Sequence, residues 1–418
     1  MSFTSEVSCW RDVRIASAAR GISVFGEFLA VTALALTLQR AGAGGLAVAG
    51  LLLAGAAPLA LLAPLAGRIA DRADSRAVLI SAGAAQAVLA TVLAFVTAPA
   101  VIIGLVALIA CGLAVTQPTL AALVPAMVRR DDITAASGLS QTVVSVGLLL
   151  GPAAGGVLTG QFGTRVPVLV AAVGYLSLVG AGLLLRTRRG GGVPRTEKET
   201  ATAPWRLRDD GLVRTMVFAL AAVVAGVGAI NVIDIFFIRE TLHASATMYG
   251  LIGATWTAGA LLGSVVFGRI GRRWTEPAQL VRLTLLLMGG CCAAVLAAAA
   301  VPNALALVPI WLAGGLCNGG LNLFAGVVVA RQVPEGARGR AYAVLSSATQ
   351  SAGMIGFLVA GPLLEMVAPR VLVAAAGIAG LVAVLACLAP VRRPGREIAP
   401  CPQVAPVRLH PVGDSVEI

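Results

Sequence analysis

The sequence predicts an all-α membrane protein, with twelve transmembrane helices arranged as two six-helix bundles that repeat in parallel. Composition is the first reason: of 418 residues, 58% are hydrophobic and 12% are charged, and the mean hydropathy is +0.92. A soluble protein of this length carries roughly a quarter charged residues. The apolar residues also gather in runs long enough to cross a bilayer. Finally, the two halves of the chain share short sequence patterns.

A helix of about 20 apolar residues crosses the roughly 30 Å hydrocarbon core of a bilayer. Charged residues, prolines and glycines bound twelve runs of that length. The first six are 15–38, 46–67, 77–97, 100–124, 138–160 and 166–186. The second six are 213–238, 248–268, 279–300, 304–330, 341–366 and 371–391.

The basic residues predict how the chain lies in the membrane. Only four of the 31 lie on one side of the predicted spans, and the other 27 lie on the side of both termini. The four are Arg40, Arg165, Arg239 and Arg370. Because lysine and arginine gather on the cytoplasmic side of membrane proteins, we expect both termini in the cytoplasm and a multi-pass protein of the cell (inner, cytoplasmic) membrane.

These spans divide the chain into four parts. Residues 1–186 are predicted to form the N-terminal bundle, and residues 213–391 the C-terminal bundle. Residues 187–212 contain three adjacent glycines and two prolines, which is typical of a linker, here a cytoplasmic one. Residues 205–214 suit a short interfacial helix. The Pro-punctuated residues 392–418 are predicted to be a disordered cytoplasmic tail.

Several function classes are disfavoured by the same composition. The net charge of +12 is spread between apolar runs, without a basic, aromatic-interleaved module for nucleic acid. The seven cysteines show no metal-ligand spacing, so neither a metal nor a cofactor is expected. No G-x-x-x-x-G-K-[ST] motif is present, and the single lysine, Lys198, lies in the linker. We therefore expect no enzyme and no nucleotide motor, and energy from an ion gradient, at about 2.3 kcal/mol per charge and 100 mV.

An internal repeat links the halves. Ala-Leu-Leu at 60–62 precedes Gly67-Arg68-Ile69 after the second span, and Ala-Leu-Leu at 260–262 precedes Gly-Arg-Ile at 268–270 after the eighth. Gly151-Pro152 in the fifth span corresponds to Gly-Pro at 361–362 in the eleventh. The related segments run in the same direction, as in duplicated transporters, so the repeat favours a two-domain transporter over a receptor.

The loop after the second span resembles a signature of the major facilitator superfamily, G-x-x-x-D-R-x-[GD]-x-R. Its residues here are Gly67, Asp71, Arg72, Asp74 and Arg76. The glycine allows close helix packing, and the Asp71 carboxylate can face a helix N-terminus across the two halves, held by the arginines. The resemblance implies a gating loop that latches the cytoplasmic side; an ordinary solvated loop is the alternative. The second copy has an arginine, Arg272, where Asp71 stands, so any latch is asymmetric.

The fifth span resembles the helix 5 motif of antiporters in that superfamily. Its residues are Gly138, Gly147, Gly151, Pro152, Gly155 and Gly156. Three glycines four residues apart share one helix face, so a neighbouring backbone can come close. The proline removes one internal hydrogen bond and can bend the helix. The resemblance implies an exporter; a generic small-residue packing face is the alternative.

Over about residues 14–393 the chain is most similar to the drug:proton antiporter branch that includes macrolide-efflux proteins and the enterobactin exporter. Pro-Thr-Leu-Ala-Ala-Leu-Val-Pro at 118–125 and Ala-Ser-Gly-Leu at 136–139 carry that similarity. The R-x-x-Q-G signature of other drug-antiporter branches is missing, and the fourth span offers only Gln117. Proton-coupling residues of those branches therefore do not transfer directly.

Two carboxylates inside predicted spans are the candidates for proton and substrate coupling, because ionisable groups in a bilayer cost about 2.5–3.5 kcal/mol. Glu27 lies in the first span and Asp234 in the seventh. The resemblance implies that spans 1, 4, 7 and 10 line the central cavity, while spans 6 and 12 face lipid. Glu27 could instead be a structural partner of Arg20, and Asp234 a hydrated acid near Arg239.

Polar residues on the same cavity spans are candidate substrate contacts. They are Gln117, Asn231, Trp311, Asn318 and Asn322. Polar packing between helices is the alternative for the asparagines.

These observations predict a secondary active transporter, a monomer that binds a small-molecule substrate, the lipid bilayer and protons or another coupling ion. Our leading hypothesis is proton-coupled efflux of amphipathic or cationic compounds by alternating access, with multidrug resistance as its outcome. An exporter of an endogenous metabolite such as a siderophore is the second hypothesis, and a non-transporting membrane sensor or scaffold the third.

Overall fold

The structure, a computed structural model, describes residues 8–187, 207, 210–271, 276–334 and 337–391. The predicted tail and most of the predicted linker, including residues 205–206 and 208–209 of the expected interfacial helix, lie outside this range. The last four residues of that helix, 211–214, form the first turn of a transmembrane helix instead.

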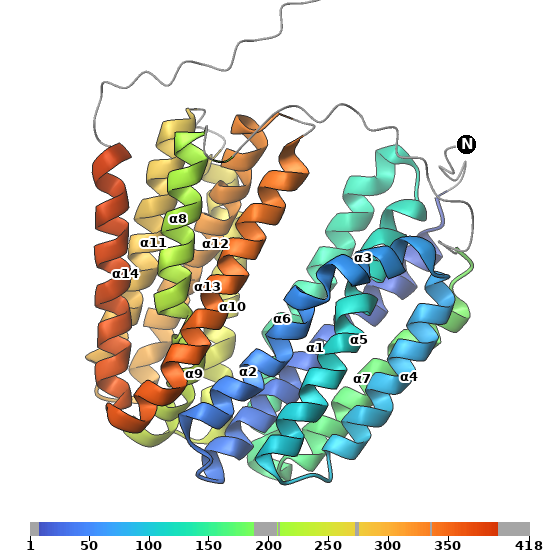
Figure 1. Cartoon of the computed structure of the whole chain (residues 1–418), viewed down its shortest axis with the longest axis horizontal. Helices are drawn as coiled ribbons and strands as arrows, with labels where there is room; N and C mark the ends of the chain where they lie inside the picture. Colours follow the sequence, from blue (N-terminus) through green and yellow to red (C-terminus); the bar gives the residue numbers. More distant parts are fainter. Residues whose placement is uncertain (1–7, 188–206, 208–209, 272–275, 335–336, 392–418) are drawn as a thin grey trace, which may run out of the picture.

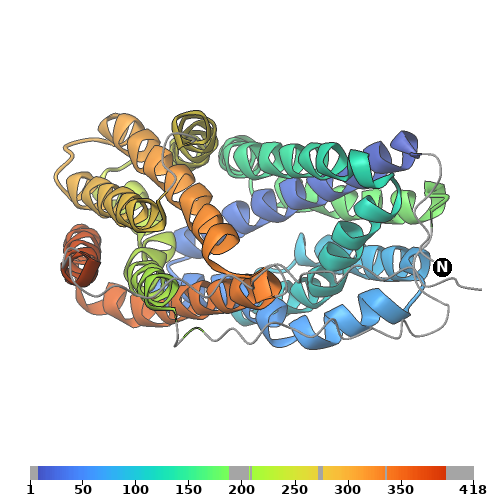
Figure 2. The same ribbon diagram turned by 90° about the horizontal axis from the view of Figure 1, so that it is seen from above.

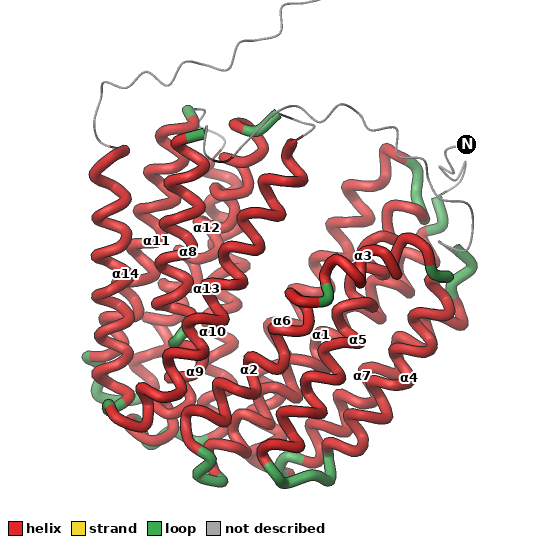
Figure 3. The backbone as a smooth tube through the Cα atoms, viewed as in Figure 1, coloured by secondary structure: helices red, strands yellow, loops and turns green. Residues whose placement is uncertain are grey.

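Long apolar helices joined by short loops make up the described chain (Figures 1 and 3). The first half consists of α1 (Trp10–Arg40), α2 (Gly44–Leu61), α3 (Ala63–Arg72), α4 (Ser75–Leu93), α5 (Pro99–Ala126), α6 (Ile133–Phe162) and α7 (Arg165–Leu184). The second consists of α8 (Gly211–Gly228), α9 (Ile230–Phe236), the π-helical turn η3 (Phe237–Thr241), α10 (Ala246–Ile270), α11 (Pro277–Ala299), α12 (Leu307–Gln332), α13 (Arg338–Met366) and α14 (Pro369–Val391). Within the described ranges, twelve spans are long and apolar enough to cross a membrane, which confirms the predicted fold class.

Two spans that the sequence predicts as continuous are interrupted. The second span breaks at Leu62, between α2 and α3, where Pro58 lies inside one helix and Pro64 opens the next. Each proline lacks a backbone N–H, so the helical hydrogen-bond ladder is incomplete there. The seventh span breaks at Ala229, directly after Gly228, and ends in the π-helical turn, where Leu242 N–H donates to Phe237 O at 3.0 Å.

The two six-helix bundles lie side by side (Figures 1 and 2). We call the side where α1 begins and α14 ends the terminal side. Contacts between the halves gather on the opposite side, where α6 meets α10 and α2 meets α13. There Gln39 Nε2 of α1 donates to Glu240 Oε1 of η3 at 3.0 Å. Toward the terminal side the bundles diverge (Figure 1).

Several polar side chains within spans of the second half are exposed. Asn322 on α12 and Ser347 and Gln350 on α13 are exposed although they lie within spans. Polar groups inside a membrane protein face the bundle interior or a water-filled cavity rather than lipid. Such side chains are therefore expected to face the interior of the protein and not lipid.

Within each half, the tightest helix pair is held by close backbone approach at glycines. In the second half, Gly259 and Gly263 of α10 face Gly315 and Gly319 of α12. A Cβ atom added at Gly319 would lie 1.9 Å from Ala260 O, so no larger residue fits there without moving a helix. In lipid, where burying apolar side chains yields little, such close packing is what holds helices together.

Replacing Gly319 by alanine is expected to destabilise the second half by about 1–3 kcal/mol, since the added methyl group overlaps the α10 backbone. Gly326→Ala is the matched control on α12, because its Cβ would lie 3.7 Å from the nearest neighbour, the Tyr342 hydroxyl. Thermal unfolding of the purified protein should give a lower midpoint for Gly319→Ala, and a midpoint at or above wild type for Gly326→Ala. Equal midpoints for both variants would contradict this packing.

Candidate functional site

The direction in which Glu27 points follows from the packing of α1. Gly21 lets α6 approach and Gly26 lets α7 approach, so those two faces of α1 are covered by neighbouring backbones. Glu27 lies on a third face, toward α5, and is half-buried. Its Oε2 atom accepts a hydrogen bond of 3.4 Å from Gln117 Nε2 on α5. Two candidates from separate spans are thus in contact.

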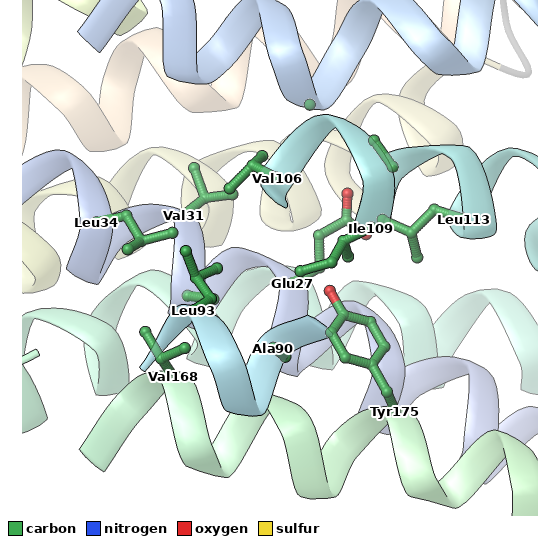
Figure 4. Close-up of a pocket in the computed structure, with 13 residues that line it drawn as sticks. Glu27, Val31, Leu34, Ala90, Leu93, Val106, Ile109, Leu113, Val168 and Tyr175 are labelled. Atoms are coloured by element: carbon green, nitrogen blue, oxygen red, sulfur yellow. The ribbon is translucent and has the colours of Figure 1, made fainter. Parts of the chain in front are cut away.

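A pocket within the first half surrounds the Glu27 side chain (Figure 4). Its lining comes from α1, α2, α4, α5 and α7. The aliphatic and glycine residues of the wall are Ala30, Val31, Leu34, Gly55, Ala90, Leu93, Val106, Ile109, Ala110, Leu113 and Val168. Glu27 and Tyr175 are its two polar side chains. The pocket therefore offers one acid and one phenol in an otherwise apolar space.

Tyr175 is a site residue that sequence reasoning missed. It lies on α7, the sixth span, which was expected to face lipid, yet its side chain is only 3% exposed. Its hydroxyl points into the pocket beside Glu27 (Figure 4). The chain contains only three tyrosines, so a tyrosine in the middle of an apolar run was the available signal.

Arg20 and Glu27 form no ion pair, although the structure describes both residues. Arg20 lies two turns before the acid, is half-buried, and donates from Nη1 to Ser140 Oγ on α6 at 3.2 Å. The structural alternative for Glu27 required a basic partner on its own helix. In this conformation the carboxylate has an amide as its neighbour instead.

Asp234 occupies a different environment on α9. Its Oδ1 atom accepts a hydrogen bond of 3.5 Å from the Tyr249 hydroxyl on α10. Arg239 donates to the Ala244 carbonyl, within the turn that follows. Asn231 is exposed and bonds back to Gly228 O at 3.2 Å. Asp234 does not line the Glu27 pocket, so the two candidate acids are not brought together.

The polar residues of α12 separate into two environments. Asn322 is exposed and donates to Asn318 O at 2.8 Å and to Asn318 Oδ1 at 3.2 Å. Trp311 is instead buried, and its ring packs edge-on against Trp256 of α10, with centroids 5.8 Å apart. The two asparagines bond to each other, with Asn322 exposed, whereas Trp311 is part of the α10–α12 packing.

The predicted gating loop covers the end of α3 and the start of α4. Asp74 caps α4, since its Oδ1 accepts from the backbone N–H of Arg76 at 3.1 Å. Gly67 has open space around it, so it makes no close helix contact in this conformation. The side chains of Asp71 and Arg72 lie outside the described part of the structure. The predicted latch therefore stays a prediction.

The helix 5 motif joins three helices. Gly147, Gly151 and Gly155 pack on the backbone of α1, where a Cβ at Gly147 would lie 2.6 Å from Gly21 O. Gly156, one residue further round the helix, packs on α10 of the other half; its Cβ would lie 2.8 Å from Gly250 Cα. Pro152 leaves α6 continuous from Ile133 to Phe162. The motif thus sets both the position of α1 and the contact between halves.

Among the described residues, no three His, Cys, Asp or Glu side chains gather in a way that could hold a metal ion. The geometry is that of a pocket with one acid and one phenol inside a helical membrane protein.

Comparison with known proteins agrees with this architecture. A family model described as a transmembrane secretion effector matches residues 8–404. No curated protein sequence matches the chain. Similar solved structures include the nucleoside transporter NupG, with 15% identity, a TM-score of 0.72, and coverage of 91% of this chain and 99% of that one. A peptide transporter POT in complex with alafosfalin has 15% identity, a TM-score of 0.71, and coverage of 90% and 93%.

A bacterial homologue of the human lysosomal transporter Spinster, in an inward-facing and unoccupied conformation, is also similar. It has 14% identity, a TM-score of 0.67, and coverage of 91% of this chain and 95% of that one. At these identities the likeness shows the major facilitator fold and nothing about cargo.

Replacing Gly156 by valine should separate α6 from α10, because the new side chain would overlap Ala246 O and Gly250 Cα. A clash of about 1–3 kcal/mol would shift the population away from this conformation by roughly 5- to 150-fold. Spin labels at Gln161→Cys and Leu251→Cys, in a background without native cysteines, report the distance between the two helices. We expect longer distances for Gly156→Val.

The matched control is Gly138→Val in the same motif, because a Cβ there would meet nothing within 4 Å. Its distance distribution should equal that of the parent protein. If Gly156→Val also leaves the distribution unchanged, the contact between α6 and α10 does not set this conformation.

Proposed function

We propose that this chain, which belongs to the transmembrane secretion effector family of the major facilitator superfamily, exports amphipathic or cationic small molecules in exchange for protons. Family membership makes it a membrane transporter of that type. The direction of transport, the coupling ion, the cargo, and a place in the cytoplasmic membrane with both termini inside are our proposal.

The observation that carries the proposal is the environment of Glu27. The carboxylate faces an aliphatic pocket, its hydrogen-bond partner is the neutral amide of Gln117, and no ion pair joins it to Arg20. An ionised acid in such surroundings is costly. It must be neutralised either by a proton or by a cationic group of the cargo.

Competition between these two neutralising partners produces exchange. If proton and cationic cargo occupy Glu27 in turn, binding of one requires release of the other. The bundles diverge toward the terminal side, and contacts between the halves join them on the opposite side (Figure 1). With the terminal side in the cytoplasm, as the positions of the basic residues favour, this conformation receives cargo from inside the cell.

Movement between two such states is supported by the seam between the halves. Gly156 and Gly250 meet directly across it, and Gly45 of α2 meets Gly361 and Leu364 of α13. The helices on either side are packed within their own halves, so each half can move as a unit. Alternating access of this kind is typical of transporters built from two repeats.

Replacing Glu27 by glutamine should abolish coupling, because the amide keeps the size of the side chain but can neither bind a proton nor attract a cation. We expect at least a tenfold loss of ethidium efflux driven by a pH gradient in proteoliposomes, together with loss of proton counterflow. Glu365→Gln, at an exposed acid near the closed end of α13, is the matched control and should export at the wild-type rate.

The proposed role of Glu27 is excluded if Glu27→Gln exports ethidium at the normal rate and still responds to the pH gradient. Asp234→Asn in the same assay tests the second candidate acid. A catecholate added in parallel tests the anionic cargo of the rival hypothesis, and a preference for it over ethidium would contradict our assignment of substrate class.

A further inference from the structure

We propose that Tyr175 determines which cations the Glu27 pocket accepts, by giving the charged head group a second hydrogen bond. The favoured ligand is then a primary or secondary ammonium with apolar substituents, and a fully substituted ammonium is disfavoured. This inference rests on the proposed function, since it concerns the cargo of the same pocket.

The first support is the state of the Tyr175 hydroxyl. The residue as a whole is only 3% exposed, and no described residue forms a hydrogen bond with its hydroxyl. The hydroxyl oxygen itself is not enclosed, because it opens on the pocket, where a ligand can supply the missing partner. The other two tyrosines do have partners: Tyr249 bonds to Asp234 and Tyr342 to Gly326 O.

The second support is where this hydroxyl points. Figure 4 shows it directed toward the same part of the pocket as the Glu27 carboxylate, with aliphatic side chains on the remaining walls. Glu27 accepts one hydrogen bond from a described side chain, that of Gln117, and the acid and the phenol do not bond to each other. Both groups therefore remain available to a molecule placed between them.

The chemistry of the two groups selects the ligand. A carboxylate only accepts hydrogen bonds, and a phenol oxygen also accepts them. A secondary ammonium carries two N–H groups and can donate one to Glu27 and the other to Tyr175. A quaternary ammonium keeps the charge but has no N–H, so it leaves the hydroxyl without a partner inside an aliphatic wall.

Contacts with two neighbouring helices fix the position of the backbone at Tyr175. Tyr175 projects from α7, whose neighbour Gly174 packs on Ile22 O of α1. Gly83 of α4 likewise packs on Tyr175 O and Leu178. The backbone that carries the phenol is thus held between α1 and α4, which fixes the point from which the side chain projects.

The test compares two probes that carry the same charge and the same apolar group. They are N-methyl-4-phenylbutylamine, a secondary amine protonated at neutral pH, and 4-phenylbutyltrimethylammonium. Dissociation constants are measured with the full-length protein in lipid nanodiscs. We expect wild type to prefer the secondary amine by about tenfold, the magnitude of one hydrogen bond to a charged group.

Tyr175→Phe should remove this preference and leave the affinity for the quaternary probe unchanged, which also shows that the variant is folded. Tyr342→Phe is the matched control, because its hydroxyl bonds to Gly326 O at 2.9 Å in the other half. That variant should keep the wild-type ratio.

Three other outcomes would contradict the role of Tyr175, and the last of them would contradict the proposed export function as well. An unchanged ratio in Tyr175→Phe, with both probes still dependent on Glu27, overturns the role of Tyr175 and leaves the proposed export function standing. A wild-type preference for the quaternary probe also overturns it. Failure of wild type to bind either probe overturns both proposals.

Discussion

Close contact between helix backbones at glycines is the constraint on which the rest of this structure depends. In lipid, apolar side chains gain little by leaving their surroundings, so helices associate where backbones can approach. The contacts of Gly21 with α6 and of Gly26 with α7 fix the rotation of α1. That rotation in turn directs Glu27 toward Gln117 and the pocket. Glu27 is directed into the pocket because the glycines Gly21 and Gly26 let neighbouring helices cover the other faces of α1.

Much of this architecture could be predicted from the sequence, because the length and polarity of a membrane span are local properties. All twelve predicted spans correspond to helices, and the paired patterns after spans 2 and 8 correctly indicated two related bundles. The breaks at Leu62 and Ala229 were not predicted, although Pro58, Pro64 and Gly228 stand beside them. Proline and glycine occur in many intact spans of this chain, so their presence alone does not locate an interruption.

The candidate site was only partly predictable, because it depends on helix rotation. Glu27 and Gln117 were selected as polar residues in apolar spans, and they contact one another. Trp311 was grouped with the asparagines of α12 by helical register, but the structure places it against Trp256, away from them. Tyr175 was overlooked because its span was assigned to the lipid boundary. Which side of a helix meets lipid is decided by its neighbours, and a single sequence does not specify them.

The seam on the closed side has a mechanical consequence. Between described residues, one hydrogen bond, from Gln39 to Glu240, joins the halves, and the closest approaches elsewhere on the seam are made at the glycines Gly45, Gly156 and Gly250. Such a surface adheres through many weak dispersion contacts and has few strong bonds to break. Separating the halves would therefore break few strong bonds, whereas a latch of several ion pairs would have to be broken and remade. The closed side is thus held together by weak packing contacts and not by a network of strong polar bonds.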